Sequence, residues 1–268
     1  MNEKQRILLT NDDGYDSPGL WAAAETLAPL AELWICAPRT QATSAARSTP
    51  PVTDGKATFE KVNRNGHQIQ AYSIGATPAQ TVQFAVLEIM PEKPDLVISG
   101  INYGINTGID ITRSGTIGAA LEAASFGIPA LAVSMQVAEH ETFSHSKSVD
   151  FSVAGFFTAY FAKLCFNQSW PSDVDVLKIE VPAQASTKTD WEVVGQAPVP
   201  LYIPKRPQRF SYNEPCTIKY GLENDYANFP ENTDANTVFV KNKVAVTPLS
   251  LNLTSRVNLN DFETQLRK

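Results

Sequence analysis

Short apolar segments recur along the first two-thirds of the chain and alternate with segments of helical periodicity. Residues 7–10 and 33–37 are almost entirely apolar or β-branched, which is typical of buried strands, and the helix formers of 20–30 lie between them. The same alternation continues with predicted strands over 95–100, 130–134 and 174–181 and predicted helices over 79–90, 117–126 and 149–166. It predicts an α/β fold, a Rossmann-like parallel sheet sandwiched by helices.

The pattern changes towards the C-terminus. Residues 53–73 alternate around Asn65-Gly66 and predict a hairpin, whereas 183–235 are rich in proline, aromatic and polar residues with little helical periodicity. The apolar alternation of 238–248 predicts a strand pair that turns at Asn242.

These boundaries predict a single α/β domain over 1–268. It would consist of a core over about 1–183, an extended and protruding β-rich arm region over about 184–245, and a C-terminal tail over 246–268. Because hairpin arms build no core of their own, we expect a homodimer or homotetramer that assembles through these C-terminal arms.

Composition narrows the classes of partner. The net charge is −6, which argues against a nucleic-acid polymer, and no apolar run reaches the roughly 18 residues that span a bilayer. The polar N-terminus has no signal region, so we expect a cytoplasmic protein without membrane contact. The three scattered cysteines lack metal-site spacing and are expected to be buried, reduced thiols: Cys36, Cys165 and Cys216.

The first predicted strand ends in two adjacent carboxylates, Asp12 and Asp13. Two adjacent carboxylates repel each other, and a hard cation that prefers oxygen ligands relieves the repulsion. Ligands of open α/β sheets bind beyond the carboxyl ends of the strands. The pair therefore marks the expected position of a metal and active site.

Other polar segments follow the same ends of neighbouring strands. The loop over 39–51 is rich in hydroxyls, Asn102 and Asn106 lie in a glycine-rich segment, and Ser114 precedes a helix whose N-terminus can bind an anion. A cation site beside an anion site predicts phosphate-ester chemistry. Each segment also has a plain interpretation, as a solvated loop, a backbone-satisfying turn or an N-cap.

These segments carry a resemblance. Thr10 to Gly14, Ala37-Pro38, Ser99 to Gly108 and Ser114 to Glu122 resemble the SurE family, whose members are metal-dependent phosphatases that act as 5′- and 3′-nucleotidases, some also cleaving short polyphosphate. The resemblance implies a nucleoside monophosphate substrate and one divalent ion, Mg²⁺ or Mn²⁺, per subunit.

The resemblance also implies the metal ligands. They would be Asp12, Asp13, Asn102 and the hydroxyl of Thr43, where the family has serine, with Ser44 as the neighbouring alternative. The chain departs from the family pattern at Ala76 and Gln80, where the family has glycine and an acid, and at Lys178 and Glu180, where it has asparagine. These departures concern substrate preference more than the reaction.

We expect metal-assisted hydrolysis in which Asp12 and Asp13 are the catalytic carboxylates. A water would attack in line, and the phosphoryl oxygens would be held by four residues: Asn106, Ser114, Gly115 and Thr116. His140 and His145 lie in a polar loop, and we expect both to be solvated rather than catalytic.

Two other classes share the acidic strand end. A covalent phosphatase would use Asp12 as its nucleophile, but its pattern is Asp-x-Asp rather than Asp-Asp-Gly. A non-enzymatic, magnesium-binding receiver module would need an acceptor aspartate where this chain has Ser99-Gly100. A dinucleotide-binding module would need Gly-x-Gly-x-x-Gly after the first strand, which is absent.

Overall fold

Nine strands form one sheet in the order β3-β4-β2-β1-β5-β6-β7-β11-β8 in the computed structural model, which describes residues 4–142, 146–223 and 225–268. From β4 to β7 all neighbours are parallel, whereas β3 and β11 each run antiparallel to the strand beside them and β8 is parallel to β11. The strands are β1 Arg6–Thr10, β2 Glu32–Pro38, β3 Ala57–Arg64, β4 His67–Ile74, β5 Leu96–Tyr103, β6 Ala130–Met135, β7 Val176–Val181, β8 Trp191–Val193 and β11 Val244–Leu249.

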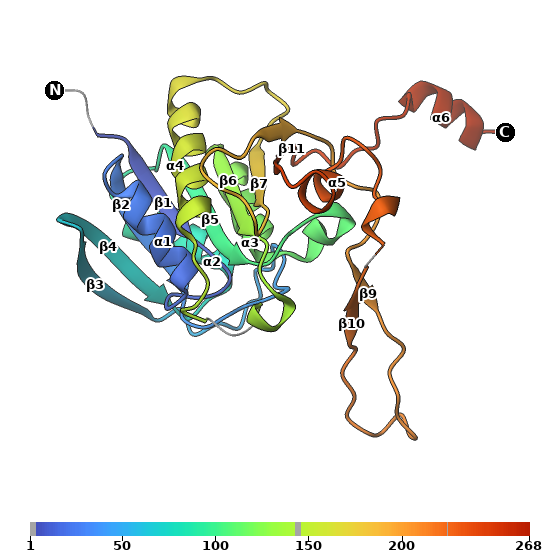
Figure 1. The fold of residues 1–268 in the computed structure, drawn as a ribbon, viewed down its shortest axis with the longest axis horizontal. Coiled ribbons are helices and arrows are strands. Elements are labelled where there is room, and N and C mark those ends of the chain that lie inside the picture. Colours follow the sequence, from blue (N-terminus) through green and yellow to red (C-terminus); the bar gives the residue numbers. More distant parts are fainter. Residues whose placement is uncertain (1–3, 143–145, 224) are drawn as a thin grey trace.

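Helices cover both faces of this sheet (Figure 1). On one face α1 (Pro18–Leu27) packs beside α4 (Ser152–Asn167), and on the other α2 (Pro78–Phe84) packs beside α3 (Gly115–Ser125). In β1, Ile7 and Leu9 belong to the core beneath α1 and α4, while Leu8 belongs to the core beneath α2 and α3. The central strand is thus buried on both sides, which confirms the predicted α/β sandwich.

The sheet reverses its strand order at β1, which lies between β2 and β5. The loops after β1 and β5 therefore diverge from adjacent strand ends and leave a crevice there. Gly100 permits the close approach of β5 to β6, because a Cβ at its φ of 141° would lie 2.3 Å from the carbonyl oxygen of Val133. The pairing with β6 shifts register between Ser99 and Asn102, just where the strand delivers its polar residues.

The predicted strand pair over 238–248 is wrong in its first half. Residues 234–239 form the helix α5 (Asp234–Phe239), capped by the Thr233 side chain, which accepts a hydrogen bond from the backbone N–H of Asn236. The turn at Asn242 is real, with a φ of 53°, and it leads into β11. The predicted tail likewise begins inside this strand, which lies in the main sheet.

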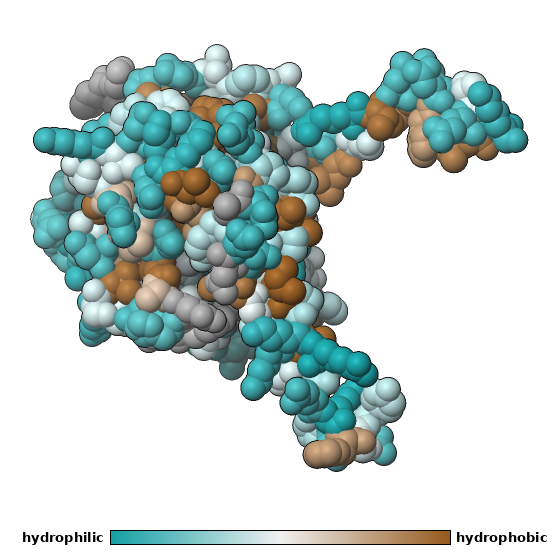
Figure 2. Space-filling model, turned by 45° about the vertical axis from the view of Figure 1, so that its right-hand side comes forward, coloured by the Kyte–Doolittle hydropathy of each residue, from teal (hydrophilic) through white to brown (hydrophobic). Residues whose placement is uncertain are grey.

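A hairpin and a terminal helix extend away from the sheet (Figure 1). The hairpin, here called the arm, comprises β9 (Tyr202–Pro204), β10 (Tyr220–Leu222) and the chain between them. The helix α6 (Leu259–Leu266) has no buried residue, and hydrophobic side chains are exposed on both projections (Figure 2).

The thiols differ in how deeply they are buried. Cys36 is buried and Cys165 partly buried, but Cys216 lies exposed in the arm, so the expectation of three buried thiols is wrong there. In the part of the chain that the structure describes, every helix is too short or too polar to cross a membrane.

The remaining elements are short helical turns: η1 Ala85–Ile89, η2 Gly108–Arg113, η3 Glu139–Glu141 and η4 Tyr226–Asn228.

Candidate active site

The turn after β1 aims two carboxylates into the crevice. The side chain of Asn11 closes this turn, because its Nδ2 donates to the carbonyl of Gly14 at 3.0 Å and its Oδ1 accepts from the Gly14 N–H at 3.1 Å. Asn11 is thereby occupied with the backbone, and Asp12 and Asp13 are left to face the crevice with only 4% and 2% of their surface exposed.

Both carboxylates are oriented by hydrogen bonds from distant segments. The Thr116 hydroxyl donates to Asp12 Oδ1 at 2.5 Å. The backbone N–H of Tyr103 donates to Asp13 Oδ2 at 3.0 Å, and the Gln41 amide donates to Asp13 Oδ1 at 2.9 Å. Gln41 and the Tyr103 N–H carry no signal in the sequence, because their role depends on three loops meeting.

Burial dominates the electrostatics of this pair. Removal from water raises the pKa of Asp12, and the hydrogen bond from Thr116 offsets this only in part. Removal from water also raises the pKa of Asp13, and the charge of Asp12 raises it further. A cation between the two carboxylates would favour their charged forms and reverse both shifts.

The N-terminus of α3 lies directly against Asp12. Ser114 is the N-cap, with its Oγ accepting from the N–H of Ile117 at 3.2 Å, and it also lines the cavity. A Cβ at Gly115 would lie 2.7 Å from the Cβ of Asp12, so a glycine allows this close contact. Two of the four residues predicted to hold the phosphoryl group lie against Asp12: Thr116 donates to its carboxylate, and Gly115 allows the close contact.

The predicted hydroxyl loop reaches the same place. Thr43 and Ser44 line the cavity, and the loop is anchored by hydrogen bonds from Ala42 N to the Asp12 carbonyl and from Ala46 N to the Arg113 carbonyl. The loop packs closely on α3, because a Cβ at Gly118 would lie 2.1 Å from the carbonyl oxygen of Ala46.

The two asparagines from the segment after β5 complete the polar wall. Asn102 donates through Nδ2 to the carbonyl of Gly104 at 2.8 Å, which leaves its Oδ1 as a potential ligand. Asn106 donates through Nδ2 to the Ser134 hydroxyl at 2.8 Å. Both residues line the cavity.

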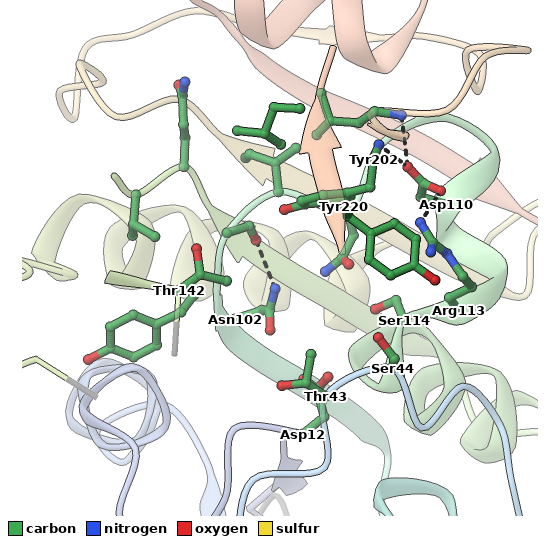
Figure 3. Close-up of a pocket in the computed structure, with 18 of the residues that line it drawn as sticks. Asp12, Thr43, Ser44, Asn102, Asp110, Arg113, Ser114, Thr142, Tyr202 and Tyr220 are labelled. Atoms are coloured by element: carbon green, nitrogen blue, oxygen red, sulfur yellow. Dashed lines mark hydrogen bonds and ion pairs between the residues drawn. The ribbon is translucent and has the colours of Figure 1, made fainter. Parts of the chain in front are cut away.

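The cavity has a volume of about 470 Å³ and two unlike walls (Figure 3). Asp12, Thr43, Ser44 and Ser114 form a polar wall, opposite the rings of Tyr202 and Tyr220 at the base of the arm. The Arg113 guanidinium stands 4.9 Å from the ring centre of Tyr220. Little in the sequence marks this second wall, because its only local signal is a basic residue beside Ser114. The cavity is also lined by Asp110, Thr142, Leu201, Leu222, Tyr226 and Phe239.

The structure thus brings Asp12, Asp13, Thr43, Asn102, Asn106 and Ser114 to one cavity. No cluster of three or more histidine, cysteine or acidic side chains suited to a metal occurs among the described residues, so a cation here would bind two carboxylates with hydroxyl and amide oxygens. The side chain of His140 is 80% exposed and away from the cavity lining, and His145 falls outside the described residues.

Comparison with known proteins agrees with this geometry. The model of the family described as "Survival protein SurE" matches residues 7–198. The "5'-nucleotidase SurE" of Methanosarcina barkeri is 36% identical over 97% of both chains, and that of Thermococcus gammatolerans is 37% identical over 96% of this chain and 93% of its own.

A solved structure agrees as well. The crystal structure of the SurE protein from Aquifex aeolicus superimposes with a TM-score of 0.75 at 28% identity, covering 98% of this chain and all of that one. The match of the family model, the full-length relatives and the shared fold together show that this chain belongs to the SurE family.

Proposed function

We propose that the protein is a divalent-metal-dependent phosphomonoesterase that hydrolyses nucleoside 5′-monophosphates. The observation that carries the proposal is a buried, oriented carboxylate pair at the reversal point of the sheet, which lines one cavity together with the hydroxyls of Thr43, Ser44 and Ser114. The full-length relatives described as 5′-nucleotidases support the same reaction.

The donor set of this cavity fits one Mg²⁺ or Mn²⁺ ion. The carboxylates of Asp12 and Asp13, the hydroxyl of Thr43 and the Oδ1 of Asn102 are hard oxygen ligands around a common space. Ser44 offers a second hydroxyl in the same loop. When bound, such an ion neutralises phosphoryl charge and assists the attack of water.

The chain's own groups would bind and orient the ester. The Ser114 hydroxyl and the second amide hydrogen of Asn106 would serve as donors for phosphoryl oxygens. The Arg113 guanidinium lines the same cavity, where it is paired with the carboxylate of Asp110. Asp12 and Asp13 are the carboxylates placed to orient the attacking water.

The second wall supports a nucleoside as the other half of the substrate. Tyr202, Tyr220, Tyr226 and Phe239 present aromatic surface on which a base can stack. Stacking on aromatic rings tolerates any base, and we therefore propose a broad nucleotide range. We extend the proposal to 3′-monophosphates and short polyphosphates, which share the phosphoryl end that the polar wall would hold.

The Asp12→Asn variant tests the proposal. We expect it to lose nearly all phosphate release from 5′-monophosphates, by at least about a hundredfold, because one charged ligand of the cation is removed. The matched control is Asp16→Asn, four residues further on at an exposed position, which should keep full activity. A fully active Asp12→Asn protein, or full activity after exhaustive chelation, would refute the metal-dependent reaction.

A substrate panel resolves the finer choices. Phosphate release from 5′-nucleotides, 3′-nucleotides and tripolyphosphate is measured with Mg²⁺ and with Mn²⁺, beside a small ester that lacks a base. We expect 5′-nucleotides to be hydrolysed with a lower KM than the small ester, because only they contact the aromatic wall.

We also propose that the protein acts as a homodimer or homotetramer in the cytoplasm. The arm and α6 expose hydrophobic side chains that nothing in this chain covers among the described residues, and burial against a second copy would remove them from water. The free thiols of Cys36, Cys165 and Cys216 suit a reducing compartment.

A further inference from the structure

Three charged side chains are completely buried behind the glycine-rich segment that follows β5. Lys178 and Glu180 project from the same face of β7, and Asp234 begins α5; each has an exposed fraction of 0%. Burying charge is costly unless each group finds partners, so a trio of this kind calls for an explanation.

Lys178 bridges the two acids. Its Nζ lies 2.8 Å from Asp234 Oδ2 and 3.6 Å from Glu180 Oε1. Two carboxylates share one ammonium group, and removal from water raises the pKa of Glu180 to about 8 despite the nearby lysine. Lys178 is thus the partner that both acids share.

Both acids also accept hydrogen bonds from the backbone of the glycine-rich segment. Glu180 Oε2 accepts from the N–H of Asn106 at 2.9 Å, and Asp234 Oδ2 accepts from the N–H of Gly108 at 3.0 Å. Asp234 Oδ1 also accepts from the N–H of Ala197 at 2.8 Å. The two backbone N–H groups that flank Thr107 are thus each fixed by one of the buried acids.

The Asn106 side chain is fixed in the same way. Its Nδ2 donates to the hydroxyl of Ser134. Ser134 on β6 is the register partner of Glu180 on the neighbouring strand β7. An amide NH₂ group has two hydrogens, so one is used by Ser134 and the other remains for a ligand in the cavity. The backbone and side chain of Asn106 are both set by residues of these two strands.

We propose that Lys178, Glu180 and Asp234 form a buried clamp that positions Asn106 to bind the phosphoryl group. The clamp touches no ligand itself, so its members are positioning residues. The inference rests on the proposed function, because it assumes that the polar wall receives a phosphoryl group.

The test removes one grip of the clamp. Glu180→Leu leaves the N–H of Asn106 without its acceptor, and we expect the KM for a 5′-monophosphate and the dissociation constant for inorganic phosphate to rise together by about tenfold, with a smaller change in kcat. Glu180→Gln keeps an acceptor oxygen and should restore both constants to within about threefold of wild type. Inorganic phosphate binding is measured by calorimetry in the presence of Mg²⁺, so that it is independent of turnover.

The matched control is Glu192→Leu, which removes an acid of the same sheet that pairs with Lys241 and Lys243 far from the cavity lining. It should change neither constant. A folded Glu180→Leu protein with unchanged phosphate binding overturns the clamp, whereas a wild-type protein that releases no phosphate overturns the proposed function instead.

A second variant covers the case in which Glu180→Leu does not fold. Lys178→Met leaves two carboxylates facing each other without the bridging ammonium, and it should weaken phosphate binding to a similar degree in a protein that retains its thermal transition. Unchanged binding in this variant overturns the proposal. Loss of the fold in both variants also overturns it, since the trio would then serve the fold and not Asn106.

Discussion

At the scale of single residues, Asp12 and Asp13 are buried side chains that accept hydrogen bonds from Thr116, Tyr103 and Gln41. This arrangement fixes the carboxylates in place, so little conformational entropy is lost when a cation binds them. It also leaves two acids in an environment that disfavours their charged forms.

The raised pKa values of this pair predict a pH-dependent stability that a divalent cation abolishes. Acids whose folded pKa exceeds the ordinary value of 3.8 stabilise the fold at low pH, and this contribution is lost as pH rises through the folded pKa. We therefore expect the melting temperature of chelator-treated protein to fall from about pH 5 to pH 8, and excess Mg²⁺ to raise it most at pH 8.

The Asp12→Asn variant is the control for this measurement, because it carries one ionisable group fewer at the pair. Its Mg²⁺-dependent rise in melting temperature at pH 8 should be much smaller than that of wild type. A rise of equal size at pH 5 and pH 8 in the wild-type protein would contradict the interpretation.

The sequence predicts those site residues whose role depends on their neighbours in sequence, and it does not predict those whose role depends on distant segments. Asp12 and Asp13 were accessible because they are adjacent and directly follow a buried strand. Gln41 and Tyr220 reach the site only through the meeting of segments distant in sequence, which periodicity does not report. Lys178 and Glu180 stood out as departures from a family pattern, but their burial behind Asn106 became visible only in three dimensions.

At the scale of elements, the loop that carries Thr43 packs closely against α3 because residue 118 of that helix is glycine. Gly118→Ala would place a methyl group 2.1 Å from the carbonyl oxygen of Ala46, where backbone must move. We expect a destabilisation of about 1–3 kcal/mol and a loss of kcat/KM of about tenfold or more, because the Thr43 hydroxyl is displaced. Thermal unfolding and phosphate release measure the two effects.

The control for Gly118 is Gly155→Ala in α4, where the new methyl group would come closest to the Thr26 side chain, at 3.0 Å, with the carbonyl oxygen of Ala22 at 3.5 Å. This variant should alter stability without changing kcat/KM. Equal activity of the Gly118→Ala protein would show that the loop does not hold a group needed for the reaction.

Element prediction succeeded where a segment was long and uniformly patterned and failed where it was short. The parallel strands and long helices of the first 180 residues follow from their periodicity. Helix α5 spans only six residues. The alternation of Val238 with the C-cap residue Val240 is compatible with a strand as well as with the end of a helix. Burial of α5 against β11 decides between the two, and no local pattern contains that contact.

At the scale of the whole molecule, the arm and α6 leave the body in two directions (Figure 1). The base of the arm packs on a hydrophobic cluster through Tyr202 and Leu222, whereas α6 has no buried residue. Phe210 and Tyr212 in the arm are 105% and 89% exposed, and Leu253 before α6 is 92% exposed. Large apolar side chains on such projections are typical of surfaces that pack against another chain.

Charge introduced on the arm should therefore break the assembly. We expect the Phe210→Asp/Tyr212→Asp double variant to have a smaller mass by light scattering than wild type, because two carboxylates would have to be buried in the contact. The control is Phe59→Asp, an exposed aromatic residue on β3 at the other edge of the sheet, which should leave the mass unchanged. A wild-type protein that is monomeric at all concentrations would refute assembly through the arm.

The cavity joins two parts of the chain that are far apart in sequence. Its polar wall comes from the loops of residues 12–116, whereas Tyr202, Tyr220 and Phe239 come from the arm base and α5. In evolutionary terms, the two walls are free to diverge at different rates. Substitutions at the arm base would reshape the aromatic wall and leave the groups proposed to hold the phosphoryl group in place, so a lineage with the proposed activity would change its substrate range without changing its chemistry.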